Sequence, residues 1–453
     1  MNHAQPSIAD PSPAHCWWLW PAVAMVAAVF FFLEHNISIS QFESYSPWTD
    51  SEGSLETGHN AAKGAALLLM GLFGAHLAVR PGGRPLRVGG WLPPLVCGYW
   101  AWLMASVCWS INPDMSARRL MTLGCFLLAA IGFARHLRLR DIAVIAVGVE
   151  AAYLLLGIGA EVALGTFRPW SADYRFAGTI HPNAQGVQMG ILCLALFCLA
   201  RYGDRHRRRC SRPPVAALWV GFAVALGFLL LSRSRASLAS LSVAIGAVWF
   251  ASASARARLM AALAAGLMVT AAALVATNSD GGANGLMGAA MMGRQEQSEG
   301  LTGRVPLWNE LAGYVHARPL QGYGYQAFWS DKHIDAISDS LDWTLRESHN
   351  GYLETALSVG LVGGVILLTV VLVGLVQAAA VYRATNDPGM AFLVGMLVFC
   401  MADACLESGV PNFAALLVEI GLAQLVLSRA GATAIAQRSP ATTSGPVSHP
   451  SGA

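Results

Sequence analysis

The chain has 453 residues, of which 55% are hydrophobic and 12% are charged, and its mean hydropathy is +0.50. A soluble domain typically carries about 25% charged residues, so this composition excludes an ordinary soluble protein and is typical of one that crosses a membrane repeatedly. The net charge of +3 is small, and no basic arm is interleaved with aromatic residues, so no nucleic-acid partner is expected.

Apolar runs of membrane-spanning length recur along the whole chain, and a transmembrane helix needs about 20 apolar residues. The first run lacks the basic flank and the cleavage site of a signal peptide, so we interpret it as a retained anchor. The tenth run is longer than one span requires, which predicts a broken or tilted start. The sequence thus predicts an all-α polytopic membrane protein of about 12 transmembrane helices, at 17–33, 61–79, 91–109, 118–134, 142–160, 183–200, 215–231, 236–251, 259–277, 352–382, 389–402 and 412–427.

Basic residues are concentrated in alternate loops, which the positive-inside rule makes cytoplasmic together with both termini. We therefore predict a cytoplasmic N-terminal tail at 1–16, helices one to nine within 17–277, one long extracytoplasmic loop at 278–348, helices ten to twelve within 349–428, and a disordered cytoplasmic tail at 429–453. The basic positions are Arg80, Arg84, Arg87, Arg135, Arg138, Arg140, Arg201, Arg205, Arg207, Arg208, Arg209, Arg212, Arg256, Arg258 and Arg383.

The long loop is expected to be functional, at least in part, because loops beyond about 15 residues are usually functional or disordered. Its second half predicts a helix that starts at Pro306 and ends at the turn residues 322–325. The apolar face of this helix is formed by Leu307, Leu311, Tyr314 and Val315. Two interpretations of the aromatic residues in the loop remain open, anchoring at the membrane interface and stacking on sugar rings. These aromatic residues are Trp308, Tyr314, Tyr323, Tyr325, Phe328, Trp329 and Trp343.

Arg233 and Arg235 stand one residue apart in a short polar turn between two apolar runs, on the outer side. Arginine near hydrocarbon is costly and tends to face a polar cavity or a partner. Snorkelling to lipid headgroups is the alternative, but two guanidinium groups on so short a turn suit phosphate oxygens, which they bind through paired hydrogen bonds. Arg118 and Arg119 are expected to open the fourth helix on the same side, and Arg175 and Arg304 lie in outer loops. We therefore expect a lipid-linked phosphate or pyrophosphate at this face.

Two histidines, His181 and His349, lie at junctions between outer loops and helices. Histidine is the side chain best suited to act as a base near neutral pH. Helix capping by Asn183 or Ser348 is the alternative, and for His181 it is as well supported as function. For His349 function is favoured. The residues expected to support the site are His181, Asn183, Asn350 and Glu354.

Neither a metal nor a cofactor is predicted. The nine cysteines lie mainly within apolar runs, and no metal-type spacing occurs among them. The sequence also lacks an Asp-x-Asp pair and a phosphate-cradling glycine loop. Four isolated acids within the spans are expected to pair inside the bundle. They are Glu150, Asp403, Glu407 and Glu419.

Six short motifs, taken together and in order, resemble the O-antigen ligase/polymerase superfamily, and within it most closely the exopolysaccharide polymerases. Each motif alone would be weak, but together they run from the third predicted span to the tenth. They are WSINPDMSAR at 109–118, GTIHPNAQG at 178–186, LSRSRAS at 231–237, LTGR at 301–304, RPLQGYGYQAFW at 318–329 and SHNGYLE at 348–354.

This resemblance implies an all-helical, C-type glycosyltransferase that needs no metal and works in the bacterial inner membrane with its active site facing the periplasm. Its donor would be a glycan on undecaprenyl pyrophosphate. Arg235 and Arg304 would hold the pyrophosphate, joined by Arg233, where related polymerases often have lysine, and by Arg118. His349 would help to activate the acceptor hydroxyl. Further implied partners are membrane lipids and chain-length regulators or other polysaccharide-export proteins.

Two reactions and one function of another class fit these motifs. A polymerase would transfer the glycan to the hydroxyl of another lipid-linked repeat, whereas an O-antigen ligase would transfer it to lipid A core. The stretch at 322–329 favours the polymerase. A transporter or flippase of the same lipid-linked oligosaccharide is the third hypothesis, but the chain lacks the internal repeat that many transporters show.

Overall fold

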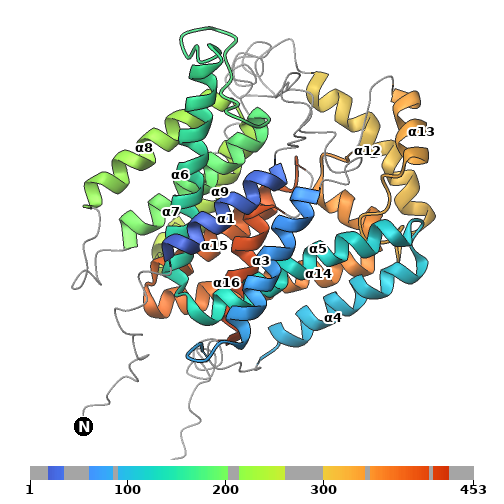
Figure 1. Cartoon of the computed structure of the whole chain (residues 1–453), viewed down its shortest axis with the longest axis horizontal. Coiled ribbons are helices and arrows are strands. Elements are labelled where there is room, and N and C mark those ends of the chain that lie inside the picture. The colour runs from blue at the N-terminus through green and yellow to red at the C-terminus, as the bar shows by residue number, and fades with distance from the viewer. Residues whose placement is uncertain are drawn as a thin grey trace, which may run out of the picture.

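The computed structural model describes residues 19–34, 61–84, 90–202, 214–260, 299–341, 347–407 and 412–427. These residues form helices joined by turns, and none of them lies in a β-strand. Figure 1 shows one helical bundle with α12 and α13 beside one end of it. The elements in chain order are α1 (Leu19–Glu34), α3 (Ala61–Val79), α4 (Leu92–Ala105), the 3₁₀-helix η2 (Ser106–Trp109), α5 (Pro113–His136), α6 (Leu139–Ala163), α7 (Pro182–Tyr202), α8 (Val215–Ser232), α9 (Arg235–Ser252), α12 (Glu299–Ala317), α13 (Asp331–Leu341), α14 (Gly351–Thr385), α15 (Pro388–Asp403) and α16 (Phe413–Leu427).

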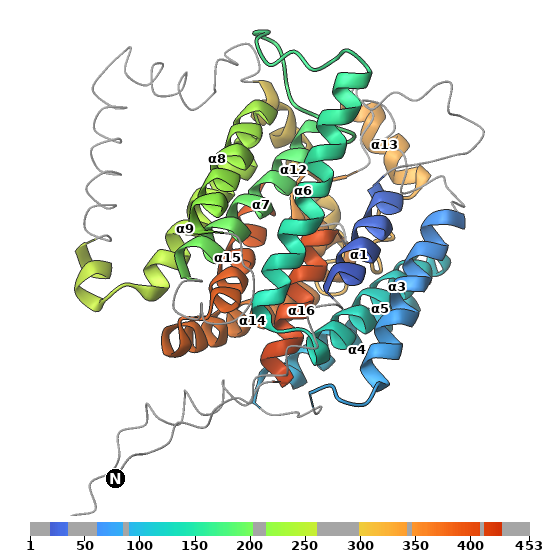
Figure 2. The ribbon, with the colours of Figure 1, turned by 60° about the vertical axis from the view of Figure 1, so that its left-hand side comes forward.

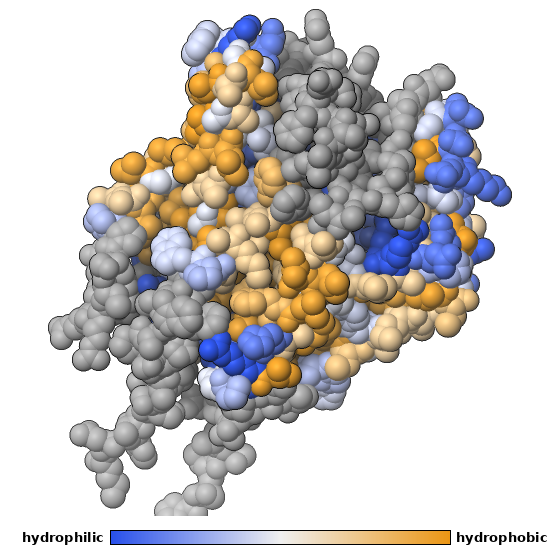
Figure 3. All heavy atoms as spheres, in the orientation of Figure 1, coloured by the Kyte–Doolittle hydropathy of each residue, from blue (hydrophilic) through white to orange (hydrophobic). Residues whose placement is uncertain are grey.

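Seven helical stretches are long and apolar enough to cross a membrane, judged by length and composition: α4 with η2, α5, α6, α7, α8, α9 and α14. The shorter helices α1, α3, α15 and α16 are also apolar. Apolar side chains cover much of the described surface in Figure 3, as expected for helices that face lipid. The prediction of an all-α polytopic membrane protein is therefore confirmed. The predicted tails at 1–16 and 429–453, and all of the predicted ninth span after residue 260, lie outside the described residues.

The fourth helix begins earlier than predicted. α5 starts at Pro113, and Asn112 Oδ1 accepts a hydrogen bond from Met115 N (3.1 Å). An asparagine cap followed by proline is favourable, because proline lacks the N–H group that the first turn of a helix leaves unbonded. The prediction that Arg118 and Arg119 open this helix is wrong, since both lie in its second turn.

α7 occupies the middle of the bundle. It is the most enclosed of the seven candidate spans and packs against α6, α8, α9 and α15. In Figure 2, α8 and α9 lie on one flank and α3, α4 and α5 on the other, with α7 and α15 nearer the centre. The first turn of α7, which includes Asn183, therefore emerges from the centre of the bundle.

α14 is broken at Gly360, whose φ of 69° and ψ of −179° are not helical. Two N–H groups beyond the break are bonded to the long loop instead: Leu361 N donates to Pro319 O (2.8 Å), and Val362 N donates to Leu320 O (3.4 Å). A β-carbon at Gly360 would lie 2.2 Å from Leu320 O, so only glycine permits this approach. The predicted break near the start of the tenth span is confirmed.

The glycine-rich turn at 322–325 docks on the same break. Tyr323 N donates a hydrogen bond to Leu357 O (2.8 Å). A β-carbon at Gly322 would lie 2.6 Å from Gly360 N and equally close to Leu357 O. α12 already ends at Ala317, so the predicted end of this helix at 322–325 is several residues too late. The turn contacts α14 backbone to backbone.

The long loop folds around an apolar core to which α14 contributes Leu357. This core corrects the interpretation of the aromatic residues in the loop. The core comprises Leu307, Leu311, Tyr323, Phe328, Trp329, Ile334, Ile337 and Leu357. Tyr325 is buried in a separate cluster with Leu103 and Val359. Because these rings are buried against protein, Tyr323, Tyr325, Phe328 and Trp329 neither anchor in the membrane interface nor offer a free face to sugar. Trp343 lies outside the described residues.

Two further expectations for this loop change. α12 begins at Glu299, so Pro306 lies inside the helix and not at its start. Proline costs the helix a hydrogen bond, but Leu307 and Leu311 are both fully buried, and their packing favours a continuous helix through this point. α13 was not expected, although its buried residues Ile334 and Ile337 recur at helical spacing.

Candidate functional site

Charged and polar side chains from separate segments meet at the end of the bundle where α7 and α14 begin and α15 ends. A hydrogen bond or an ion pair joins each of them to another member of the set. His349 and Glu407 are connected by proximity, because a ring nitrogen of the one and a carboxylate oxygen of the other lie within 4.8 Å. We call this set the polar cluster; it consists of Arg175, Asn183, Arg304, Glu347, His349 and Glu407.

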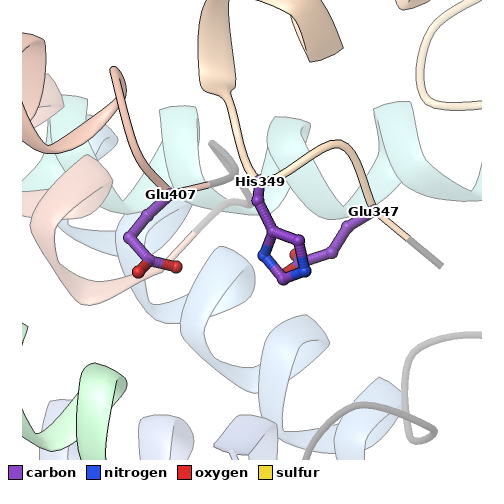
Figure 4. A group of neighbouring side chains, drawn as sticks. All are labelled: Glu347, His349 and Glu407. Carbon is purple, nitrogen blue, oxygen red and sulfur yellow. The ribbon is translucent and has the colours of Figure 1, made fainter. Parts of the chain in front are cut away.

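His349 and Glu347 form the most direct contact in the polar cluster. His349 Nδ1 lies 2.8 Å from Glu347 Oε1. Figure 4 shows the imidazole beside the Glu347 carboxylate, with the Glu407 carboxylate approaching from another segment. The His349 side chain is 16% exposed and that of Glu347 is 37% exposed, so the histidine is the more enclosed of the two.

The backbone holds His349 in an uncommon conformation. Its φ is 49°, in the left-handed region that non-glycine residues seldom adopt and that is enriched at functional sites. The preceding residue, Ser348, is fully buried, and its carbonyl accepts a hydrogen bond from Trp308 Nε1 (2.9 Å). The following residue, Asn350, caps α14 by accepting from Tyr352 N and Leu353 N. Asn350, and not Ser348, is therefore the helix cap.

Glu354 fastens the long loop to α14 and lies outside the polar cluster. Both of its carboxylate oxygens lie 2.9 Å from Trp329 Nε1, and Oε2 also accepts from Ser348 N (3.4 Å). Asn350 Nδ2 donates to Cys405 O (3.2 Å), which ties the start of α14 to the turn after α15. These two predicted supporting residues thus fix the backbone on either side of His349.

Glu407 connects the histidine to an arginine and to α7. Its Oε1 lies 3.9 Å from Arg304 Nη2 and accepts a hydrogen bond from Asn183 Nδ2 (3.3 Å). Arg304 also donates from Nη1 to Leu406 O (2.7 Å). The expectation that Glu407 lies within a span is wrong, because it follows the end of α15 by four residues. Its expected pairing inside the protein is confirmed.

Arg175 links this set to the turn that carries Arg233 and Arg235. Arg175 Nη2 donates to Asn183 Oδ1 (2.9 Å), and its Nε donates to Ser232 O (3.1 Å). Arg233 follows at once, with a left-handed φ of 54°, and its guanidinium donates to Ala172 O. Arg235 is the first residue of α9. The α8–α9 turn is therefore joined to the polar cluster through Arg175.

Two groups in the cluster have shifted pKa values. Burial lowers the pKa of His349, but the Glu347 carboxylate in contact with Nδ1, with the charge of Glu407, outweighs it, so the pKa is raised overall. Burial raises the pKa of Glu407, against the opposing charges of Arg304 and His349. The imidazole is thus more basic than an ordinary histidine, as a proton acceptor requires.

The structure does not bring all predicted residues into the cluster. His181 immediately precedes α7, and its Nδ1 accepts from Asn183 N (3.2 Å). His181 is therefore the residue that caps α7, and not Asn183 as the capping interpretation had it, because Asn183 lies in the first turn of the helix. Arg118 is exposed on α5, and its Nε donates to Asp114 O of the same helix (3.3 Å). Neither side chain is among those joined to His349 or Arg304 in the described contacts.

Glu347, His349 and Glu407 present donor atoms within 4.8 Å of one another, a spacing that a cation could use. However, Arg304 already places positive charge beside Glu407, and Nδ1 of His349 is engaged by Glu347. These residues suit proton transfer better than metal binding. Metal independence stays a prediction.

Three members of the polar cluster were not among the predicted site residues: Arg175, Glu347 and Glu407. Glu347 could have been found, since it precedes His349 by two residues at the junction between the long loop and α14. Glu407 follows His349 by 58 residues, and no local pattern in the sequence relates the two positions.

The fold and the cluster define a polytopic membrane protein with a partly enclosed, charged site at one end of its bundle. The O-antigen ligase family model matches residues 220–368, a segment that includes Arg233, Arg235, Arg304 and His349. Over 390 residues, the chain is 26% identical to the exopolysaccharide production protein ExoQ of Rhizobium meliloti (strain 1021), covering 76% of this chain and 83% of that protein. The predicted resemblance to the O-antigen ligase/polymerase superfamily is thereby confirmed. The matches support a surface-polysaccharide function of the ligase/polymerase type.

Proposed function

We propose that this protein is a bacterial surface-polysaccharide polymerase of the inner membrane. It transfers glycan from undecaprenyl pyrophosphate to a hydroxyl of another lipid-linked repeat, at a site facing the periplasm. The observation that carries the proposal is the polar cluster, in which a carboxylate-paired histidine lies in the same network as Arg304.

The proposed reaction is a direct displacement at the anomeric carbon. His349 takes the hydroxyl proton on Nε2 while the hydroxyl oxygen forms its bond to that carbon. The bond from the carbon to the pyrophosphate oxygen breaks, and the pyrophosphate leaves with the electron pair. Arg304, Arg235 and Arg233 stabilise the negative charge that develops on it. Such a displacement inverts the anomeric configuration.

Glu347 gives His349 its proposed role. A carboxylate at Nδ1 favours the tautomer with hydrogen on that nitrogen, which leaves the lone pair on Nε2. It also stabilises the imidazolium that forms during transfer. Orientation of a base by a carboxylate is a recurrent arrangement in nucleophilic catalysis.

We expect Glu347→Gln to move the acid limb of the pH–rate profile to lower pH. The neutral imidazole is the active form, so turnover is lost as pH falls through the pKa of His349. Glu347 raises that pKa, and its removal therefore lowers the pH at which turnover is lost. The plateau rate should also fall, because the base is weaker and less well oriented. The measurement is turnover by purified protein between about pH 5 and 9.

The control is Asp335→Asn, which removes the charge of an exposed acid on α13 and should leave the pH–rate profile unchanged. An identical profile for wild type and Glu347→Gln would remove Glu347 from the mechanism.

We expect Arg235→Lys to impair donor use even though the charge is kept, because an ammonium cannot make the forked contact of a guanidinium. Loss of one charge-assisted contact predicts a fall in kcat/KM for the donor of roughly 10-fold to 100-fold. Arg168→Lys, at an exposed outer-loop arginine, is the matched control. Full activity of Arg235→Lys would mean that position 235 needs charge alone.

The identity of the glycan acceptor, tested with purified protein, distinguishes a polymerase from an O-antigen ligase and from a transporter. Purified protein in detergent, given only lipid-linked repeats and a metal chelator, should build a ladder of longer chains. A ladder in detergent would exclude a pure transporter, because no membrane remains to be crossed. If glycan is transferred only after lipid A core is added, the protein is an O-antigen ligase. A ladder that disappears with the chelator would contradict metal independence alone.

A further inference from the structure

A second feature lies at the opposite end of the bundle from the polar cluster. α15 packs against both α9 and α14, which contact each other less, and a hollow of about 420 Å³ remains between the three helices. Its walls are apolar, from Phe250 of α9, Leu375 of α14 and Val394 of α15. Gly246 leaves open space on the α9 side of the hollow, since a β-carbon added there would meet nothing within 4 Å.

The hollow has one polar end. Arg383 is its charged lining residue, and Arg383 Nε donates to Ala251 O at the end of α9 (2.8 Å). Arg258 lies beside the same end, with its guanidinium carbon 5.8 Å from the centre of the Phe250 ring. Arg383 is exposed, so positive charge faces outward at this end. The hollow is therefore apolar along its length and cationic at its mouth.

The dimensions match one leaflet of a bilayer. Leu375 and Arg383 are eight residues apart, which corresponds to about 12 Å along α14. Half of a hydrocarbon core is about 15 Å thick. Because Arg383 belongs to the last turn of α14, the mouth lies at headgroup level when the hollow lies at the depth of the acyl chains.

We propose that this hollow binds one anionic glycerophospholipid, with an acyl chain between α9 and α14 and its phosphate at Arg383 and Arg258. Basic pockets between transmembrane helices are recurrent sites for anionic headgroups. A zwitterionic lipid would fill the walls equally well, but the cationic group of its headgroup would lie beside two arginines. α9 carries Arg235 at its other end, and α14 begins two residues after His349. The lipid therefore lies between the helix that carries Arg235 and the helix that follows His349.

The test measures lipid retention by the full chain. Purified protein is reconstituted with phosphatidylglycerol or phosphatidylcholine, washed in detergent, and examined by native mass spectrometry. We expect one phosphatidylglycerol to be retained by the wild type, and Arg383→Gln to reduce its occupancy by roughly five- to tenfold. Arg80→Gln, at an arginine that follows α3 on the other flank, is the charge control and should retain the lipid.

A second variant tests the hollow without touching the arginines. Gly246→Leu should fill it and displace the lipid, while α9 keeps its fold because leucine favours helix over glycine. Gly98→Leu, at an equally open position of α4, is its control. Equal retention of phosphatidylcholine and phosphatidylglycerol, unchanged retention by Gly246→Leu, or equal losses from Arg383→Gln and Arg80→Gln would each overturn the proposal. Recovery of an isoprenoid lipid in place of the glycerophospholipid would overturn it too, by assigning the hollow to the glycan carrier.

Discussion

His349→Asn and His349→Ala are both expected to abolish most glycan transfer while the protein still accumulates in the membrane. Loss of a general base typically costs about 10² to 10⁴ in rate. Asparagine tolerates the left-handed backbone found at this position better than alanine does, so His349→Asn separates the loss of the base from backbone strain. The measurement is turnover of a lipid-linked repeat by purified protein, beside an immunoblot of the membrane fraction.

His316→Ala provides the matched control for these variants, because His316 is exposed on α12, within the same loop. It should leave turnover unchanged. Retention of more than about half the wild-type turnover by His349→Asn would contradict the assignment, since a general base contributes at least about a hundredfold. The role of His349 would then be structural, through its backbone conformation at the junction between the long loop and α14.

Gly360→Ala is expected to destabilise the protein by about 2–5 kcal/mol, because it combines a backbone conformation restricted to glycine with a steric clash. The new β-carbon would lie 2.2 Å from Leu320 O, so the 319–324 turn would have to leave the break in α14. The thermal unfolding midpoint in detergent should fall by roughly 5 °C or more. Glycan transfer should fall with it, since α14 follows His349 directly.

Gly364→Ala is the control on the same helix. A β-carbon at Gly364 would meet only Thr355 Cγ2, at 3.9 Å, which is an ordinary contact. Alanine in a regular helix is more favourable than glycine by about 1 kcal/mol, so this variant should melt at or slightly above the wild-type midpoint. Equal midpoints for Gly360→Ala and Gly364→Ala would show that the turn does not depend on the break.

Much of the bundle could be predicted because the length of a membrane helix is visible in the sequence as the length of an apolar run. The run at 61–79 is reproduced by α3 to the residue, and the excess length of the tenth run anticipated the break at Gly360. The start of α5 was missed for the opposite reason. The segment before Arg118 is polar, and a helix that projects beyond the hydrocarbon region leaves no apolar run to detect.

The candidate site was only partly predictable. Arg304 and His349 were identified because a charged or titratable residue in a loop stands out against an apolar chain. Glu407 could not be connected to them, since the pairing depends on how the end of α15 packs beside α7 and α14. The loop aromatics were misinterpreted because composition does not distinguish a ring buried against protein from one that faces lipid or sugar.

The contact between the 322–325 turn and α14 also has a consequence for genetics. At Gly360 the obstructing atom is the Leu320 carbonyl, and at Gly322 the obstructing atoms are Gly360 N and Leu357 O. Each is a backbone atom, which every amino acid possesses. When a larger residue replaces either glycine, no substitution at the residue it clashes with can remove the obstructing atom, so no second-site suppressor is expected there. A clash between two side chains differs, because replacing one of them with a shorter side chain relieves it. Revertants selected from such strains should restore glycine at the mutated codon.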